Sequence, residues 1–438
     1  MATHARGSES HSQGRELRKV VAASTVGTMI EWYDFFLYIS AAALVFNQLF
    51  FPSFDPWVGT LIAFGTNALG FVARPVGGIV FGHYGDRIGR KRLLMLSLVL
   101  MGAATVLIGC LPTYGQIGVW APVLLILLRL VQGFAVGGEW GGAVLLAAEH
   151  GDAARRGFWA SWPQAGVPLG LILASGVLAI MSGLLSDEAF VAWGWRVPFL
   201  LSAVLVLLGW WIRNSVSESR TFETALASAE APPRAPALEV FRERPRALLV
   251  GAGLRLGENI SYYIITGFSL SYITQAAGLT RDVALQAVLI GSIAHFLVIP
   301  LAGRISDAVG RRWVYAAGGL GLAAFSFAFF PMLASGSFGV IVLAMTIALV
   351  LHGTMYGPQA AMIAELFPTR IRYSGASIAY QLTSIVAGSL APIVAGTIFR
   401  LTGEAFWIAV YVGAACLVSG IAALLARETR GVELSSID

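Results

Sequence analysis

Two short polar stretches of this sequence match each other. The first reads Gly82-His83-Tyr84-Gly85-Asp86-Arg87-Ile88-Gly89-Arg90-Lys91, and the second reads Gly303-Arg304-Ile305-Ser306-Asp307-Ala308-Val309-Gly310-Arg311-Arg312. The offset between them, 221 residues, is close to half of the 438-residue chain. A shorter acid-to-arginine pattern repeats at nearly the same offset: Glu149 and Arg156 recur as Glu365 and Arg372. The chain is therefore predicted to consist of two similar halves.

The residues around these motifs are strongly apolar. Hydrophobic residues make up 57% of the chain and charged residues only 12%, whereas a soluble domain carries about 25% charged residues. The mean hydropathy is +0.75. This composition provides too little charge for a water-facing surface, so we expect the chain to be embedded in lipid.

Twelve apolar runs are long enough to cross a bilayer as helices, which takes about 17–25 residues each. They cover residues 20–46, 57–81, 93–111, 119–147, 157–183, 192–212, 247–275, 283–303, 313–334, 338–363, 374–398 and 405–426. We therefore predict an all-α polytopic membrane protein with 12 transmembrane helices in two six-helix bundles. The expected parts are a tail at 1–19, a first bundle at 20–212, a linker at 213–246, a second bundle at 247–426 and a tail at 427–438.

The basic residues predict the orientation of these helices. Of the 29 Lys and Arg residues, three lie deep inside the predicted spans, three (Arg196, Arg281 and Arg400) lie at span ends or in the loops of one side, and the rest lie on the side of both termini and the linker. Because basic loops mark the cytoplasm, we predict cytoplasmic termini in a bacterial inner (plasma) membrane protein. Residues 1–19 have no apolar core and are expected to be a cytoplasmic tail, not a signal peptide. The scattered basic clusters do not form a stripe for nucleic acid.

Seven ionisable residues fall inside the predicted spans. A charge at the bilayer centre costs about 2.5 kcal/mol or more, so such residues are candidates for function. They are Glu31, Asp34, Arg74, Arg129, Glu139, Arg255 and Glu258. From the helical rise of about 1.5 Å per residue, most lie near the middle of the bilayer. We expect Asp34, Arg129 and Glu258 to meet in one wet pocket between the halves.

Polar and aromatic residues share helix faces with these charges. By helical spacing, the groups are Glu31 with Asp34 and Tyr38; Arg129 with Gln132 and Glu139; Arg255 with Glu258, Asn259 and Tyr262; and His352 with Tyr356 and Gln359. Tyr33 and Trp140 are further aromatic candidates for contact with a substrate. These faces are expected to line a binding cavity.

Side-chain chemistry assigns a role to each charge. The planar fork of Arg129 matches the two oxygens of a carboxylate, and Arg255 is the second candidate for this role. Burial and mutual repulsion disfavour the ionised forms of Glu31 and Asp34, so both are expected to carry protons. Glu258 either shares this work or pairs with Arg255.

Other buried polar residues have more than one interpretation. Glu139 lies among glycines and acts either as a gate or in helix packing. His295 and His352 fit satisfied polar groups of the bundle better than proton relays. Arg74 precedes Pro75 near the cytoplasmic end and is expected to extend toward the membrane surface.

Longer motifs carry a resemblance to a known family. They are Gly27 to Phe35, Ala73 to Gly78, Arg129 to Gly142, Trp193 to Phe199 and Glu365 to Gly375, together with the paired stretches at 82–91 and 303–312. The paired stretches resemble the signature of the major facilitator superfamily. The whole set is similar to the metabolite:proton symporter family, and most to its shikimate transporter-like members. The resemblance implies proton-coupled symport (uptake) of a small organic acid by alternating access.

The same resemblance implies gating residues on the cytoplasmic side. In one copy, charge pairs form among Asp86, Arg90, Glu149 and Arg156; in the other, among Asp307, Arg311, Glu365 and Arg372. The alternative is that these residues only stabilise the fold and its orientation.

Other classes of function fit the sequence less well than uptake of an organic acid. Uptake of a zwitterionic osmolyte such as proline or betaine is the alternative, because an aromatic face can hold a quaternary ammonium. An enzyme is not expected, since the sequence shows no HExxH, CxxC or nucleophile-elbow motif. Cys110 and Cys416 are too few for a metal cluster, and no cofactor is expected. The expected partners are a small organic anion, H+ and the lipid bilayer, and the chain is expected to be a monomer.

Overall fold

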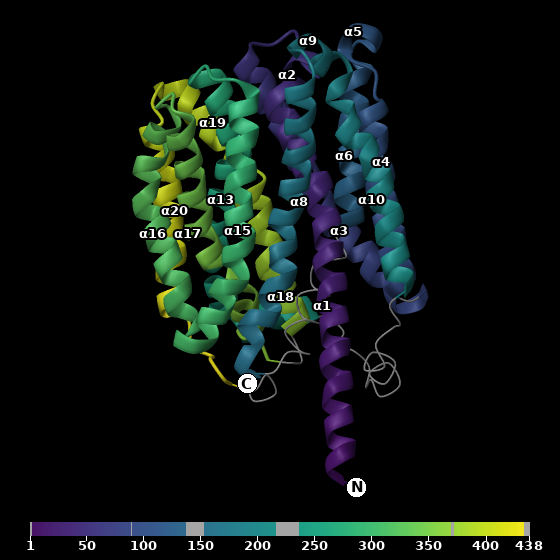
Figure 1. Ribbon diagram of the computed structural model, residues 1–438, viewed down its shortest axis with the longest axis vertical. Coiled ribbons are helices and arrows are strands. Elements are labelled where there is room, and N and C mark those ends of the chain that lie inside the picture. Colours follow the sequence, from purple (N-terminus) through teal and green to yellow (C-terminus); the bar gives the residue numbers. More distant parts are fainter. Residues whose placement is uncertain (1, 89, 137–152, 216–235, 369–371, 433–438) are drawn as a thin grey trace.

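The computed structural model describes residues 2–88, 90–136, 153–215, 236–368 and 372–432. Within these ranges all regular structure is helical, and the helices run side by side along the long axis of the molecule (Figure 1). The all-α prediction is therefore confirmed for the described part of the chain.

The first half contains long helices joined by short helical turns. Its elements are α1 (Ala2–Ala41), η1 (Ala42–Phe46), α2 (Asn47–Phe50), α3 (Pro56–Ile88), α4 (Arg90–Cys110), α5 (Tyr114–Ile117), α6 (Trp120–Val136), η2 (Ala153–Arg155), α8 (Arg156–Leu184), α9 (Asp187–Ala189), η3 (Phe190–Gly194) and α10 (Arg196–Ser215).

The second half begins with a short helix that lies in the predicted linker. Its elements are α12 (Pro236–Glu243), α13 (Pro245–Tyr263), η4 (Ile264–Phe268), α14 (Ser269–Ser271), η5 (Tyr272–Ala276), α15 (Arg281–Val309), α16 (Arg311–Leu333), α17 (Phe338–Ala364), α18 (Arg372–Thr383), η6 (Ser384–Gly388), α19 (Ala391–Thr402) and α20 (Phe406–Leu425). Here η4, η5 and η6 are π-helical turns that interrupt long helices.

Each of the twelve predicted spans overlaps helical structure. Among the described residues, eight helices are long and apolar enough to cross a membrane, and α9 with α10, bent by 42°, would be a ninth. Two further apolar helices, Met95–Cys110 and Trp120–Val136, are shorter. The number of twelve crossings therefore stays a prediction. The start of α1 differs from expectation, because the helix begins at Ala2 rather than near Val20 and extends well beyond the bundle (Figure 1).

Local sequence explains where several helices begin and end. Thr280 precedes α15, and its hydroxyl accepts a hydrogen bond from the amide of Val283. α15 ends at Gly310, whose φ of +112° favours glycine. The next helix, α16, is capped from a distance, since the Glu428 carboxylate accepts from the amides of Arg311 and Arg312. A carboxylate at a helix N-terminus is stabilised by the exposed amides and the helix dipole.

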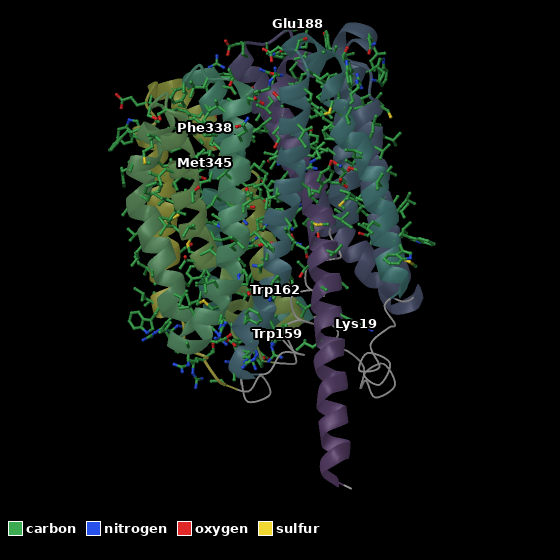
Figure 2. All side chains as sticks on the ribbon, viewed as in Figure 1. Lys19, Trp159, Trp162, Glu188, Phe338 and Met345 are labelled. Carbon is green, nitrogen blue, oxygen red and sulfur yellow. The ribbon has the colours of Figure 1, made fainter. Side chains whose placement is uncertain are left out.

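The two halves meet along α8 and α15, which pack against each other over much of their length. α8 also packs against α1 and α17, while α3 packs on α6 and α4 on α10 within the first half. Glu188 lies at one end of the helix bundle, and Lys19 lies toward the opposite end (Figure 2). Large apolar side chains such as Leu207, Leu249 and Leu401 are exposed on the outside, as expected for a lipid-facing surface.

Candidate functional site

Arg129 lies on α6 in a close contact between α6 and α3. An added Cβ on Gly133 would lie 1.9 Å from the carbonyl oxygen of Gly70, so these two glycines allow the helices to touch. Gly70 also leaves room for the guanidinium, because a Cβ there would lie 3.1 Å from Nε of Arg129. The glycine contact thus places an arginine inside the bundle, where it is 4% exposed.

The partners of Arg129 carry no charge. Its Nη1 donates to Oε1 of Gln132 at 3.0 Å, and its Nη2 donates to Oδ1 of Asn67. The guanidinium lies 4.4 Å from the ring centre of Tyr38, in cation–π geometry. Among the described residues, no carboxylate lies within 4 Å of its nitrogen atoms. Arg129 is therefore a buried cation without a counter-ion in this part of the chain, and its Nε has no hydrogen-bond partner there.

Asp34 lies on α1 beside the same group. Its Oδ1 accepts a hydrogen bond of 2.7 Å from Ser202, and its buried Oδ2 has no partner among the described residues. A cavity of about 20 Å³ lies next to it, and about 10–15 Å³ is enough for one water molecule. The polar residues that line this cavity are Glu31, Asp34, Arg74, Arg129 and Gln132.

The side chain of Arg74 does not point where the sequence predicted. It does not extend toward the membrane surface but is 8% exposed, with its guanidinium 4.1 Å from the ring centre of Phe71. The interior offers it an aromatic face and the wall of the cavity, which explains why the side chain turns inward.

Arg255 and Glu258 form a second polar cluster, in the other half. Nη1 of Arg255 donates to Oε2 of Glu258 at 2.5 Å, and both side chains are buried. Gln359 bridges the pair, accepting from Arg255 and donating to Glu258 at 3.2 Å each. The ring of Tyr380 lies 3.6 Å from the guanidinium. Glu258 therefore pairs with Arg255, and its role as a proton carrier stays a prediction.

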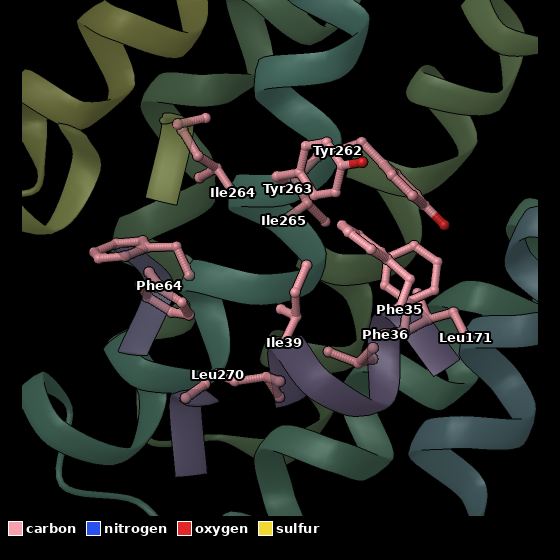
Figure 3. Packing of buried hydrophobic residues seen from close by; sticks show 14 of the residues in the cluster. Phe35, Phe36, Ile39, Phe64, Leu171, Tyr262, Tyr263, Ile264, Ile265 and Leu270 are labelled. Atoms are coloured by element: carbon pink, nitrogen blue, oxygen red, sulfur yellow. The ribbon is translucent and has the colours of Figure 1, made fainter. Parts of the chain in front are cut away.

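An aromatic layer separates the two clusters. Phe35 of α1 contacts Tyr263 of α13 with ring centres 5.5 Å apart, and Phe36 contacts Tyr262 at 5.6 Å. Phe71 of α3 adds a third contact, with Tyr263. Figure 3 shows the Phe35 and Phe36 rings of α1 beside Tyr262 and Tyr263. The expectation that Asp34, Arg129 and Glu258 share one pocket is therefore not met in this structure, since packed rings fill the space between them.

The other predicted contact residues take varied positions. Tyr33 donates to the carbonyl of Pro198 at 2.6 Å and thus joins α1 to α10. Tyr38 is hydrogen-bonded to Thr66. Tyr262 stacks on His352 at 4.6 Å, and Tyr356 faces His295. Asn259 is buried, and its Oδ1 has no partner among the described residues. Trp140 lies outside the described residues.

The predicted gating residues meet across the two halves. Nη1 of Arg156, at the start of α8, lies 2.8 Å from Oε1 of Glu365 at the end of α17. Asp307 accepts from the amides of Gly157 and Phe158 in the first turn of α8, at 2.9 Å each. Arg311 pairs with Asp307 at 2.6 Å and lies 3.5 Å from Glu365.

The pairs expected within the second copy are present, because Arg311 lies close to both Asp307 and Glu365. The structure adds a pair that the resemblance did not imply: Arg156 of the first half pairs with Glu365 of the second. The cause is spatial: α8 packs along α15 and α17, so its first turn faces the other half. Arg372 donates from Nε to the carbonyls of Ala364 and Phe367. Glu139, Glu149 and the side chains of Asp86 and Arg90 lie outside the described part.

Sequence reasoning missed several residues of these clusters. Thr105, Asn67 and Ser202 are the neutral partners of Gln132, Arg129 and Asp34. Near the C-terminus, the Thr429 hydroxyl donates to Oε2 of Glu365, and the Val432 carbonyl accepts from Arg156 at 3.1 Å. The pair Glu428-Thr429 interrupts an otherwise basic stretch after α20, which is the only signal in the sequence that could have drawn attention to it.

Comparison with known proteins agrees with this architecture. The sequence model described as "Sugar (and other) transporter" matches residues 19–230 and 224–438. The chain belongs to this family. It is a multi-pass transporter of the major facilitator superfamily in the bacterial inner membrane, and it is not an enzyme.

Curated relatives of this transporter extend over nearly the whole chain. The Shikimate transporter of Escherichia coli (strain K12) is 43% identical over 94% of this chain and 95% of its own length. The Inner membrane metabolite transport protein YhjE of the same organism is 42% identical over 94% of both chains. The Proline/betaine transporter of Escherichia coli (strain K12) is 31% identical over 94% of this chain and 84% of its own. The resemblance to shikimate transporter-like members is thus confirmed.

A solved structure shows the same fold. The inward open xylose transporter XylE from E. coli superposes with a TM-score of 0.75, covers 96% of this chain and 99% of its own, and is 17% identical. At this identity the likeness supports the major facilitator fold alone.

Proposed function

We propose that this transporter takes up a small organic anion together with protons, by alternating access. The observation that carries the proposal is the environment of Arg129. Within the described ranges, this guanidinium is held by two neutral amides and an aromatic ring, and no carboxylate forms an ion pair with it. A buried cation requires a compensating negative charge. A substrate carboxylate would supply that charge in a two-pronged hydrogen bond.

A cyclic hydroxy acid such as shikimate is the substrate class that we favour. The relative named as a shikimate transporter is more similar to this chain than the proline/betaine relatives are. The hydroxyls of such an acid would find amide and hydroxyl partners around Arg129 in Gln132, Asn67 and Tyr38. In this proposal, the predicted contact residues of the second half close on the same substrate when the halves move.

Proton coupling is assigned to Asp34, with Glu31 and Glu258 as further carriers. Asp34 lines the same small polar cavity as Arg129, and its Oδ2 has no hydrogen-bond partner among the described residues. A protonated Asp34 leaves the positive charge of Arg129 to the substrate, whereas an ionised Asp34 competes for it. Proton binding and anion binding then favour each other.

The topology of the proposal follows the sequence. Twelve spans form the bundles at 20–212 and 247–426, with the linker at 213–246 and both tails in the cytoplasm. We propose a monomer as the transporting unit, because each chain contains both halves of the pathway.

Uptake into proteoliposomes with an acidic exterior tests this function. A panel of shikimate, quinate, 2-oxoglutarate, citrate and betaine should show accumulation of at least one carboxylate that collapses when the pH gradient is dissipated. Arg129→Gln should lower this uptake about 100-fold or more, and Arg129→Lys should restore it only in part because the ammonium lacks the planar fork. Arg400→Gln, an exposed arginine outside both clusters, is the matched control.

Two results of the substrate panel would contradict the proposal. Accumulation of betaine alone would assign the protein to zwitterion uptake, the function of its proline/betaine relatives. Uptake of a carboxylate that does not respond to the gradient would remove proton coupling.

A further inference from the structure

His295 and His352 lie next to the Arg255–Glu258 pair and are fully buried. Nδ1 of His352 on α17 is 2.9 Å from Nε2 of His295 on α15. On its other side, Nε2 of His352 faces two oxygen atoms of α13: the backbone carbonyl of Glu258 at 3.2 Å and its Oε1 at 3.4 Å. Three helices thus bring two imidazoles and a carboxylate into one row.

The contacts of this row determine which ring nitrogens carry hydrogen. Nε2 of His352 faces only acceptors, so it holds its proton and donates toward Glu258. In a neutral imidazole, Nδ1 of His352 is then the acceptor, and Nε2 of His295 donates to it. Nδ1 of His295 then carries a lone pair and no hydrogen. This atom is buried and has no hydrogen-bond partner among the described residues. The row therefore begins with an open proton acceptor and ends at a carboxylate.

We propose that these histidines conduct a proton to Glu258 and so give the second half its own proton-binding site, an inference that rests on the function proposed above. A proton binds Nδ1 of His295, and the Nε2 proton of that ring moves to Nδ1 of His352. The Nε2 proton of His352 then moves to Oε1 of Glu258. Both imidazoles stay neutral with exchanged tautomers, the carboxylate becomes a carboxylic acid, and the reverse sequence releases the proton.

The other groups around the row fit this role. The titratable groups that surround it are Arg255 and Tyr262 from α13, Tyr315 from α16, Tyr356 from α17, Tyr380 from α18 and Cys416 from α20. Of these only Arg255 carries a charge at neutral pH. Tyr262 packs on His295 at 5.3 Å and on Phe36 of the other half at 5.6 Å. The open end of the row is therefore one ring away from the surface along which the halves move.

Protonation of Glu258 changes the state of Arg255. The guanidinium loses its only carboxylate partner within the described residues and keeps Gln359, Ser384 and the Tyr380 ring. This environment resembles the neutral one of Arg129, and it fits an anion in the same way. A proton delivered by the histidines thus creates the second anion-binding cation, which couples proton binding to substrate binding.

The experiment compares two transport rates of the full-length protein in proteoliposomes, using the carboxylate that the panel identifies. Gradient-driven uptake needs net proton movement, whereas exchange of labelled for unlabelled substrate without a gradient does not. His295→Gln and His352→Gln should lower gradient-driven uptake about 100-fold while exchange stays close to the wild-type rate. Ser292→Ala, one turn from His295, is the control and should change neither rate, because the Ser292 hydroxyl donates to the Val288 carbonyl of its own helix.

Binding of the same carboxylate, followed by tryptophan fluorescence, gives a second readout. Wild-type affinity should rise as pH falls. Glu258→Gln, which resembles the protonated acid, should bind more tightly than wild type at high pH and show a smaller rise, because only Asp34 then titrates with binding. If a histidine variant does not fold, this comparison still tests whether protonation of Glu258 promotes substrate binding.

Three results would overturn the inference. Histidine variants that keep gradient-driven uptake show that no proton passes through the rings. Equal loss of uptake and exchange assigns the histidines to packing. A wild-type protein that transports none of the carboxylates refutes the proposed function itself, and this inference with it.

Discussion

Arg129 and Arg255 illustrate how neighbours decide the state of a buried charge. Both are buried arginines beside an aromatic ring. Arg255 has Glu258 at 2.5 Å, whereas Arg129 donates its hydrogen bonds to amides and, among the described residues, forms no ion pair with the Asp34 carboxylate of the same cavity. An ion pair that loses one partner leaves an uncompensated charge in a medium of low dielectric. The unpaired arginine is therefore the one that an anionic substrate would neutralise.

Asp34→Asn should separate proton movement from substrate movement. Asparagine resembles the protonated acid and can still accept from Ser202, so the substrate site should stay intact. We expect gradient-driven uptake to fall about 100-fold and exchange without a gradient to persist, both measured in proteoliposomes. If uptake and exchange decline together, Asp34 supports the structure rather than the coupling.

Glu258→Ala should destabilise the protein by about 3–5 kcal/mol, because it leaves Arg255 buried and unpaired. The double variant Arg255→Met with Glu258→Leu removes both charges and should recover much of this loss. Thermal unfolding in detergent, followed by circular dichroism, compares the two. A double variant less stable than Glu258→Ala would contradict the argument.

At the scale of the helices, glycine contacts determine how closely α3 and α6 approach. The carbonyl oxygen of Gly70 occupies the place where a side chain on Gly133 would begin. Small residues allow such contacts between membrane helices, where packing replaces the hydrophobic effect as the main source of association. The same contact holds Arg129 in place, so helix packing and the binding site depend on the same two residues.

Gly133→Ala should therefore push α3 and α6 apart. The added Cβ would lie 1.9 Å from backbone, which cannot move aside as a flexible side chain can. We expect a loss of about 1–3 kcal/mol or more in stability, together with loss of carboxylate binding. Gly65→Ala on α3 is the matched control, because its Cβ would meet nothing within 4 Å. Equal melting temperatures for the two variants would refute the role of the contact.

At the scale of the whole molecule, the halves touch at both ends. At one end Arg156, Asp307 and Glu365 join α8 to α15 and α17. At the other, Gln275 donates to Thr60 at 3.0 Å, and Trp57 packs on Phe399 with ring centres 5.4 Å apart. The halves are therefore in contact at both ends among the described residues, and the balance of these contacts is expected to decide which end opens.

Glu365→Gln should open the end that holds the chain termini. Glu365 accepts from Arg156 and Thr429 and lies near Arg311, so the variant weakens a buried network that spans the halves. A loss of about 3 kcal/mol would change the populations roughly 100-fold. Spin labels at the exposed positions Arg155 and Arg304 would report this as a longer distance.

Thr60→Val is the opposite control, since it removes a contact at the other end. It should leave the Arg155–Arg304 distance short. An unchanged distance in Glu365→Gln would show that the network does not hold this end closed.

Patterns in the sequence predicted the features that depend on nearby residues. Arg129 and Gln132, three positions apart, do share a face and a hydrogen bond. Asp307 and Arg311, four positions apart, form the charge pair that the resemblance implied. The partners Asn67 and Ser202 were not predicted, because they approach Arg129 and Asp34 from helices far along the chain.

The sequence alone determined the helical class, the two related halves and the few charged residues inside the apolar runs, where a charge is costly to bury and therefore indicates a functional site. These are local properties: the length of an apolar run and the solvation cost of a side chain do not depend on the rest of the fold. Only the tertiary structure decided which arginine has a counter-ion, which half Arg156 contacts, and that aromatic rings keep the two charge clusters apart. The last two facts depend on helix packing, because it brings together residues such as Arg156 and Glu365, or Phe35 and Tyr263, that lie far apart in the sequence.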